Sequence, residues 1–161
     1  MSNIEIVSGQ DYIDEVLELF KEYKRELNVD VSFQPSDETE AEVIKVYDKI
    51  YIALVDGKVA GCIAFHKMTN KTDCELKRLF VREKFRGLHI GRLLLQHAID
   101  EVKKLNYNAI YLDTLTTLKP ACRLYEKFGF EKIAAYYHNP LPDVCYYKLE
   151  LNKHIRRTIS R

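Results

Sequence analysis

The chain has 161 residues, of which 47% are hydrophobic and 30% are charged, a balance typical of one soluble globular domain and not of a disordered chain. Its 25 lysines and arginines against 24 aspartates and glutamates give a formal net charge of +1, which excludes the strongly basic field of a general nucleic-acid binder. No apolar run approaches the roughly 20 residues of a membrane span, and the first residues lack the regions of a secretory signal, so we expect a cytoplasmic protein.

Helical spacing of apolar residues dominates the start of the chain. Residues 4–7 alternate as a short strand, and apolar side chains at helical spacing predict an amphipathic helix from about residue 11 to 27. Further on, Asp37 and Glu40 have the spacing of a capping box and predict the start of a second helix. We interpret the acidic residues 37–42 as the first turn of that helix, where negative charge suits the helix dipole.

The middle and the end of the chain alternate strands with helices. Residues 50–55 and 59–65 read as a hairpin, because they are joined by Asp56-Gly57, which a type I′ turn prefers. The later predicted elements are a strand over 74–81, a helix over 90–105, a strand over 109–113, a helix over 119–128 ended by Gly129, and strands over 131–135 and 144–151. The sequence therefore predicts an α/β (α+β) fold: a mixed, mostly antiparallel sheet flanked by helices, with a central right-handed β-α-β crossover.

The domain organisation is predicted to be simple. We expect a single domain over residues 1–152, followed by a solvated basic tail over residues 153–161, which holds four basic residues and no acidic one. The four cysteines form no CxxC motif and do not cluster with histidines. This pattern argues against a zinc site and a redox pair, so we expect reduced thiols and no metal.

The segment over residues 79–92 carries the strongest chemical signal. It reads as a strand, a basic turn with glycines and the start of a long helix. A helix start leaves backbone N–H groups unpaired, and glycine lets a phosphate approach them closely, a role that suits Gly87 and Gly91 with Arg86 and Arg92 as charge partners. No Gly-Lys-Ser/Thr or GxGxxG pattern is present, which excludes a P-loop and a dinucleotide fingerprint. A bland alternative is a plain turn with solvated arginines.

The stretch CELKRLFVREKFRGLHIGRLLLQHAIDEVKKL resembles the central motif of the GNAT-type N-acetyltransferase superfamily. In that family a (Q/R)xxGx(G/A) turn binds the pyrophosphate of acetyl-coenzyme A, and here the pattern is KFRGLH, from Lys84 to His89. His89 stands where the family usually has glycine or alanine. The stretch YLDTLTTLKPACRLYEKFGF is similar to the family's LYxxxGF element, and the resemblance is best over residues 50–151.

The resemblance implies acetyl-CoA as co-substrate. Pantetheine would pair like an extra strand along residues 79–81, where the backbone N–H of Phe80 or Val81 would hold the thioester oxygen. The implied cofactor-binding residues are Leu79, Phe80, Val81, Arg86, Gly87, Leu88, His89, Ile90, Gly91 and Arg92.

Two residues are candidates for proton transfer. A primary amine with a pKa of about 10.4 is mostly protonated at neutral pH, so the reaction needs a proton acceptor. Glu75 matches the strand position where several family members carry a catalytic glutamate; the alternatives are a water relay, or an exposed carboxylate paired with Lys77 or a neighbouring strand. Tyr125, in the LYxxxGF element, is the implied general acid for the departing thiolate, and its alternative role is packing beside Leu124 and Phe128.

The acceptor is the least determined part of the prediction. Residues 28–49 and 136–142 are expected to border its pocket, where Tyr136, Tyr137 and His138 bind the ligand or pack. The sequences YYHNP and SFQPSDE resemble a widespread bacterial GNAT subgroup whose substrates are mostly unassigned. We expect direct attack by the primary amine of a small molecule, with no nucleic-acid or membrane partner. The alternatives are a protein lysine or N-terminal acetyltransferase and a non-catalytic CoA-binding sensor or interaction module. Family members often pair, so a homodimer is an expectation.

Overall fold

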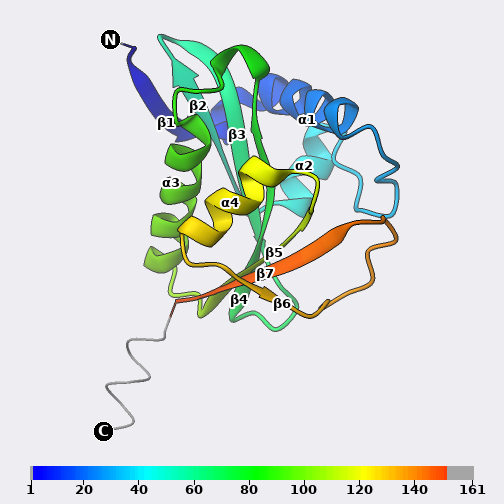
Figure 1. Cartoon of the computed structure of the whole chain (residues 1–161). Coiled ribbons are helices and arrows are strands. Elements are labelled where there is room, and N and C mark those ends of the chain that lie inside the picture. Colours follow the sequence, from blue (N-terminus) through cyan, green and yellow to red (C-terminus); the bar gives the residue numbers. More distant parts are fainter. Residues whose placement is uncertain (1, 152–161) are drawn as a thin grey trace, which may run out of the picture. The chain divides into compact units, whose positions relative to one another are not determined.

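The computed structural model describes residues 2–151 (Figure 1), so the predicted tail over 153–161 lies outside the described residues. The elements in chain order are β1 (Ile4–Ser8), the 3-10 turn η1 (Gly9–Tyr12), α1 (Ile13–Leu27), α2 (Glu40–Val46), β2 (Lys49–Val55), β3 (Lys58–Lys67), β4 (Asp73–Val81), the 3-10 turn η2 (Glu83–Phe85), α3 (Ile90–Lys104), β5 (Ala109–Leu115), α4 (Lys119–Lys127), β6 (Glu131–Ile133) and β7 (Val144–Glu150). Each predicted helix and strand is present, with ends shifted by a few residues.

The strands form one seven-stranded sheet in the order β1-β2-β3-β4-β5-β7-β6. The pairs β1–β2, β2–β3, β5–β7 and β6–β7 are antiparallel, and β4–β5 is parallel, with α3 as the crossover between them. The mixed, mostly antiparallel sheet and its central β-α-β unit are therefore confirmed. Over residues 2–151 no helix combines the length and apolarity that crossing a bilayer requires.

The chain divides into two compact units. Unit 1 contains the residues up to His66 together with Leu76–Glu101, and unit 2 contains Lys67–Glu75 and the residues from Val102 onward. The first three residues of β4 thus belong to unit 2 and the rest of the strand to unit 1. The single domain expected over residues 1–152 stays a prediction.

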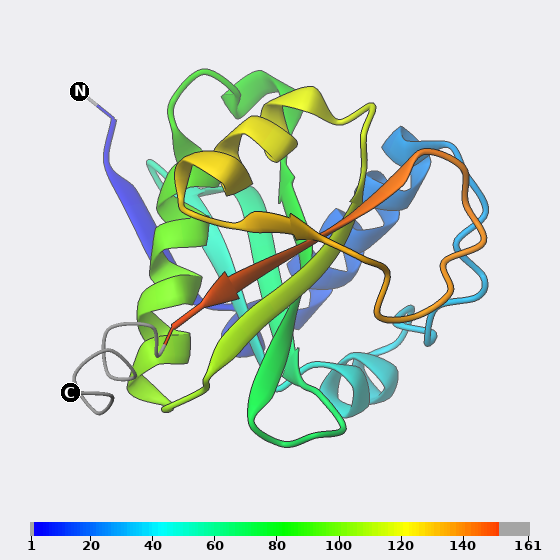
Figure 2. The same cartoon turned by 60° about the horizontal axis from the view of Figure 1, so that its bottom comes forward.

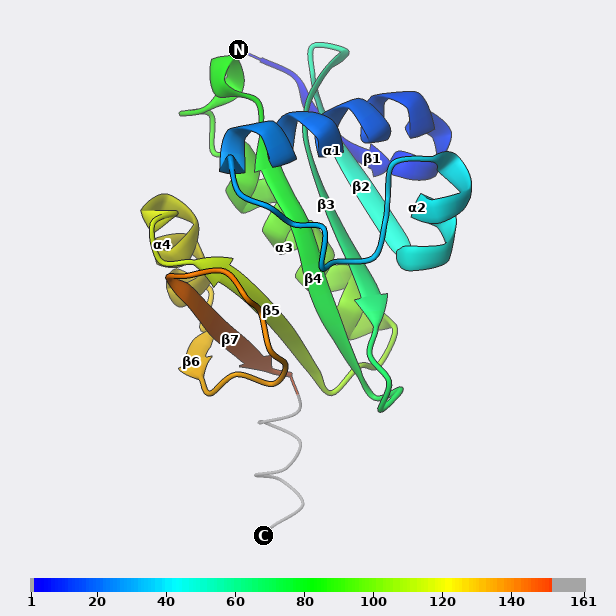
Figure 3. The same ribbon diagram turned by 90° about the vertical axis from the view of Figure 1, so that its right-hand side faces the viewer.

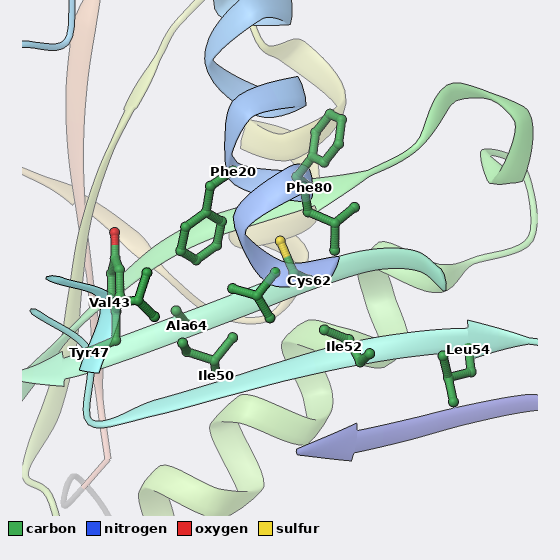
Figure 4. Close-up of a cluster of buried hydrophobic side chains, with 11 residues drawn as sticks. Phe20, Val43, Tyr47, Ile50, Ile52, Leu54, Cys62, Ala64 and Phe80 are labelled. Atoms are coloured by element: carbon green, nitrogen blue, oxygen red, sulfur yellow. The ribbon is translucent and has the colours of Figure 1, made fainter. Parts of the chain in front are cut away.

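Unit 1 packs helices on both faces of its strands. Figure 3 shows α1 and α2 on one face and α3 on the other. Residues two apart on a strand share a face, so Ile50, Ile52 and Leu54 of β2 join the buried cluster under α1 and α2, drawn in Figure 4. Tyr51 between them points the other way, and its ring lies 4.5 Å from that of His97 on α3.

The turn signals in the sequence are confirmed by backbone angles. Asp56 and Gly57, which join β2 and β3, have φ values of 50° and 80°. Both are positive, as a type I′ turn requires. Gly129, which follows the last turn of α4, has a φ of 97° and provides the left-handed residue that commonly ends a helix.

The predicted start of the second helix was wrong by two residues. The capping box is formed by Thr39 and Glu42: the Thr39 hydroxyl accepts from the Glu42 N–H at 3.2 Å, and the Glu42 carboxylate accepts from the Thr39 N–H at 3.1 Å. Asp37 is not in this cap. It is buried and bound to Arg78 and Lys24. Its position is set by these ion pairs with residues distant in the sequence, and the helix cap is provided by Thr39 and Glu42 instead.

Unit 2 is built from β5, β7 and β6 with α4 packed against them. β7 lies between β5 and β6 in the sheet (Figure 2). An aromatic group joins α4 to the strands: the ring of Tyr125 lies 5.7 Å from that of Phe130 and 5.9 Å from that of Tyr147 on β7. These contacts fix the face that α4 turns toward the sheet.

Candidate active site

In unit 1 the loop before α3 has the backbone of an anion site. Gly87 has a φ of 90° and His89 a φ of 61°, and the carbonyl of His89 accepts from the Leu93 N–H at 3.1 Å, so His89 is the residue before the first helical one. The N–H groups of the first turn, including those of Ile90 and Gly91, have no acceptor within the helix and present a positive dipole end. The backbone at position 89 is left-handed, a conformation that glycine adopts without steric cost and that a residue with a side chain adopts less readily.

The side chains of this loop face two environments. Gly87, Leu88, His89 and Arg92 are exposed, and Ile90 is buried. The exposed residues leave the backbone of the turn accessible to a ligand, and the buried isoleucine anchors the start of α3 in the core.

Two arginines of this region are already held by acidic residues of α1. Arg82 binds the Glu22 carboxylate with two hydrogen bonds of 2.9 and 2.7 Å. Arg86 binds Glu26 at 2.6 and 2.8 Å and donates from Nε to the Val81 carbonyl at 2.9 Å. The predicted phosphate ligand Arg86 is therefore not freely solvated. Its guanidinium already binds Glu26 of α1 and the carbonyl of Val81 at the end of β4.

The predicted pantetheine strand, Leu79, Phe80 and Val81, is the last part of β4 and follows an irregular residue of that strand. Arg78 has a φ of 61° inside the strand, a left-handed conformation that is rare in a strand and interrupts its regular pleat. A Cβ on Gly61 of β3 would lie 2.4 Å from the Phe80 carbonyl, so only glycine allows this approach of the two backbones. The irregularity was not predicted, since nothing in the sequence of the strand distinguishes Arg78 from its charged neighbours Glu75 and Lys77.

In unit 2, Glu75 lies within the sheet. It is opposite Tyr111 in the parallel register of β4 and β5, and it is 7% exposed. Its carboxylate accepts a hydrogen bond from the Tyr136 hydroxyl. Burial and the negative charge of Glu75 raise the pKa of Tyr136, so the phenol stays protonated and remains a donor. The candidate base is thus a buried, oriented carboxylate.

A second carboxylate, Asp113, shares this face of the sheet, because it lies two residues beyond Tyr111 on β5. It accepts from the Tyr137 hydroxyl and from the Asn139 amide at 2.7 Å. Burial, and then its bond to Asp113, raise the pKa of Tyr137. Sequence reasoning missed Asp113; the available signal was a carboxylate in an otherwise apolar and aromatic strand.

The loop over residues 136–142 is therefore tied to the sheet by its tyrosines. Tyr136 and Tyr137 each bind a carboxylate, and the Tyr146 hydroxyl donates to the Tyr137 carbonyl at 2.8 Å. His138 is exposed. The two tyrosines singled out as ligand contacts or packing residues thus have a further role, which is to orient Glu75 and Asp113.

Tyr125, the predicted general acid, is 6% exposed within the aromatic group of unit 2. The neighbouring Tyr147 hydroxyl donates to the Glu126 carboxylate at 2.5 Å. These surroundings agree with a packing role for the ring and leave its acid role a prediction.

The segment between α1 and α2 lines a pocket in unit 1, and its prediction as a border of the acceptor pocket stays a prediction. A pocket of about 400 Å³ is lined by Lys24, Val29, Asp30, Val31, Ser32, Gln34, Pro35, Ser36, Glu38 and Arg78. Its volume is that of a small-molecule site.

Known proteins are similar to this chain in sequence and in fold. The sequence model of the acetyltransferase (GNAT) family matches residues 13–130. An uncharacterized N-acetyltransferase of Schizosaccharomyces pombe is 42% identical over 159 residues, which cover 94% of this chain and 98% of that protein. The structure of a GNAT-family acetyltransferase from Staphylococcus aureus matches with a TM-score of 0.74 at 26% identity and covers 92% of this chain and 99% of that one. A Bacillus anthracis structure in complex with acetyl coenzyme A matches with a TM-score of 0.57 at 29% identity, over 65% of this chain and 63% of that one. The GNAT-like architecture expected from the motifs is confirmed by these neighbours.

Proposed function

Because this chain belongs to the acetyltransferase (GNAT) family and is thereby an acetyl-CoA-dependent N-acetyltransferase, we propose that its acceptor is the primary amine of a small molecule. The amine attacks the acetyl thioester directly. A C–N bond forms, the C–S bond breaks, and the ammonium proton passes to a base. The observation that carries this proposal is the buried Glu75 carboxylate, oriented by Tyr136.

Glu75 is the proposed base. A carboxylate in this position can accept the ammonium proton either directly or through one water molecule. Its hydrogen bond from the Tyr136 hydroxyl fixes the orientation of the carboxylate.

The proposed cofactor contacts are mostly backbone groups. The N–H groups at the start of α3 and the left-handed Gly87 suit the pyrophosphate. The backbone after the left-handed Arg78 suits pantetheine, with the N–H of Phe80 or Val81 as donor to the thioester oxygen. Leu79, Leu88, His89 and Arg92 belong to the same two segments.

Coenzyme A binding and acetyl transfer are expected together. At a hundredfold excess over its Kd, coenzyme A adds about 2.7 kcal/mol to the stability, which corresponds to roughly 5–10 °C in melting temperature for a chain of this length. Thiol release from acetyl-CoA across a panel of small amines measures turnover. Peptides form a second panel of acceptors. If coenzyme A binds but no small amine causes thiol release, the proposal is contradicted.

Gly87→Ala tests the loop in the same thermal assay. An added Cβ has open space there, but the φ of 90° is strained for alanine, so the loop shifts and the coenzyme A effect falls. Gly57→Ala is the matched control, since it also has a positive φ and open space but lies in the β2–β3 turn. Equal coenzyme A shifts in the two variants count against the loop.

Tyr125→Phe tests the proposed general acid. A thiolate with a pKa near 8.5 is already a fair leaving group, so we expect a loss of only about tenfold in kcat. Phenylalanine keeps the packing against Phe130 and Tyr147. Tyr147→Phe, which removes a neighbouring hydroxyl, serves as control, and full turnover of Tyr125→Phe refutes the acid role.

A further inference from the structure

Two cysteines of unit 2, Cys122 on α4 and Cys145 on β7, are brought together by the packing of the helix on the sheet. The Tyr147 hydroxyl donates to the Glu126 carboxylate at 2.5 Å, and α4 and β7 run in the same direction (Figure 2). Cys145 lies two residues before Tyr147 on the same face of the strand, a step of about 6.8 Å. Cys122 lies four residues before Glu126 on the same face of the helix, a step of about 6 Å. Because the two steps are nearly equal, the two thiols face each other.

The thiols are also in contact. Cys122 Sγ donates to the Leu115 carbonyl at 3.6 Å, and Leu115 follows Thr114, which pairs with Cys145 in the register of β5 and β7. The Cys145 thiol is hydrogen-bonded to the Cys122 sulfur. Both thiols are free, and both residues are half-buried. The absence of a CxxC motif predicted no redox pair, but the fold supplies the proximity that the spacing in the sequence lacks.

The two thiols differ in their surroundings. A pocket of about 290 Å³ is lined by Thr116, Lys119, Cys122, Arg123, Glu126 and Lys132, and Cys145 is not among the described residues of this lining. Burial and the neighbouring Cys122 raise the pKa of Cys145, so Cys145 stays a thiol at neutral pH. The thiolate is the nucleophile in sulfur exchange. Cys122 is therefore placed to meet a reagent first, with Cys145 behind it.

The lining of this pocket is positive. Three cations, Lys119, Arg123 and Lys132, stand against the single carboxylate of Glu126. That carboxylate already accepts from the Tyr147 hydroxyl. The lining thus has two positive charges in excess, which raise the local concentration of an anionic reagent.

We propose that Cys122 and Cys145 form a thiol–disulfide exchange site for small anionic disulfides. The Cys122 thiolate attacks one sulfur of the reagent, whose S–S bond breaks as the mixed disulfide forms, and one thiol leaves. Cys145 then loses its proton to solvent and attacks the Cys122 sulfur, which releases the second thiol and leaves a disulfide between α4 and β7. The protein gives up two electrons, and the reagent is reduced to two thiols. No step of this exchange uses acetyl-CoA, so its tests are independent of acetyl transfer.

Oxidised glutathione, which has a net negative charge at neutral pH, is the probe. The reduced full-length protein is incubated with an excess of it, and mass spectrometry of the intact and the digested protein locates the product. We expect a mass lower by two hydrogen atoms and a cross-linked peptide pair that contains Cys122 and Cys145. The buried Cys62 and Cys74 should stay reduced. A protein that stays fully reduced, or a cross-link between other cysteines, overturns the proposal.

Two variants test the order of attack. Cys145→Ser removes the second thiol, so glutathione should remain attached to Cys122 as a mixed disulfide. Cys122→Ser leaves only the thiol outside the pocket lining, and the rate of glutathione addition to the Cys122–Cys145 site should fall about tenfold or more. Circular dichroism shows whether both variants are folded. Faster addition at Cys145 than at Cys122 contradicts the assigned order.

Arg123→Gln tests the selection by charge. We expect glutathione addition to slow several-fold, whereas Lys127→Gln, which removes an exposed cation of the same helix outside the lining, should keep the rate of the wild type. Cystamine, a disulfide with two positive charges, should react more slowly than oxidised glutathione once each rate is divided by that for a small neutral thiol. Salt should reduce this difference. Equal corrected rates for the two reagents, or equal effects of the two substitutions, contradict the proposal.

Discussion

Replacement of Glu75 by glutamine is expected to lower kcat/KM by a factor of about a hundred or more at neutral pH, the range associated with a lost general base. Glutamine is isosteric and can still accept from the Tyr136 hydroxyl that now binds the carboxylate, so the fold and coenzyme A binding should be retained. A steady-state assay of thiol release, with the thermal shift as the binding control, measures the effect.

The pH dependence separates a base from a structural carboxylate. At pH 7 only about one amine molecule in 2,500 is neutral, and this fraction rises tenfold with each pH unit up to the pKa. The deficit of Glu75→Gln should therefore shrink as the pH approaches 10. Asp113→Asn is the matched carboxylate variant, because Asp113 binds Tyr137 and Asn139 on the same face. If the activity deficit of Glu75→Gln is the same at every pH, or if Asp113→Asn loses more activity, Glu75 is not the general base.

Replacement of Asp37 by alanine is expected to destabilise the protein by about 3–5 kcal/mol, the usual cost of stranding a buried charge. Arg78 and the Tyr47 hydroxyl would both lose their acceptor. Urea denaturation should show a lower midpoint with an unchanged slope. Glu38→Ala, the exposed neighbour, is expected to change stability by no more than about 0.5 kcal/mol. Equal midpoints for the two variants contradict the importance of these buried contacts.

The same residue gives a pH signature. Burial raises the pKa of Asp37, but the charge of Arg78 and the hydrogen bonds from Lys24 and Tyr47 outweigh it, so the pKa is below its ordinary value. A carboxyl with a depressed pKa in the folded state contributes stability above its unfolded value of about 3.9 and loses it as the pH falls through the folded value. The stability gap between the wild type and Asp37→Ala should therefore narrow below about pH 4.

Local signals predicted the parts of the fold that depend on neighbouring residues. The Asp56-Gly57 turn and the end of α4 at Gly129 are examples, since both follow from backbone angles that few residues adopt. The motif around Gly87 predicted the loop and the start of α3 for the same reason. The prediction of the start of α2 failed because several neighbouring polar residues could have served as its cap. Only the contact with Arg78, which is distant in the sequence, places Asp37 in the core.

The charged and aromatic networks could not be predicted, because they join residues far apart in the chain. Glu75 was found through a motif, but its partner Tyr136 lies 61 residues away. Asp113 gave no motif at all and became visible only through its contacts with the loop after β6. Arg78 likewise gains its significance from Asp37, 41 residues away. Pairwise contacts of this range leave no periodic trace in a single sequence.

The two arginines bound to α1, Arg82 and Arg86, determine how the affinity for the cofactor depends on ionic strength. Glu22 and Glu26 lie one helical turn apart, and they bind Arg82 and Arg86, which have the same spacing. A phosphate that reaches Arg86 would replace a carboxylate and would add no new ion pair. Screening by salt would then weaken the pair lost and the pair gained alike. The affinity would rest on fixed backbone dipoles at the start of α3, and a highly charged cofactor would be bound with a shallow dependence on salt.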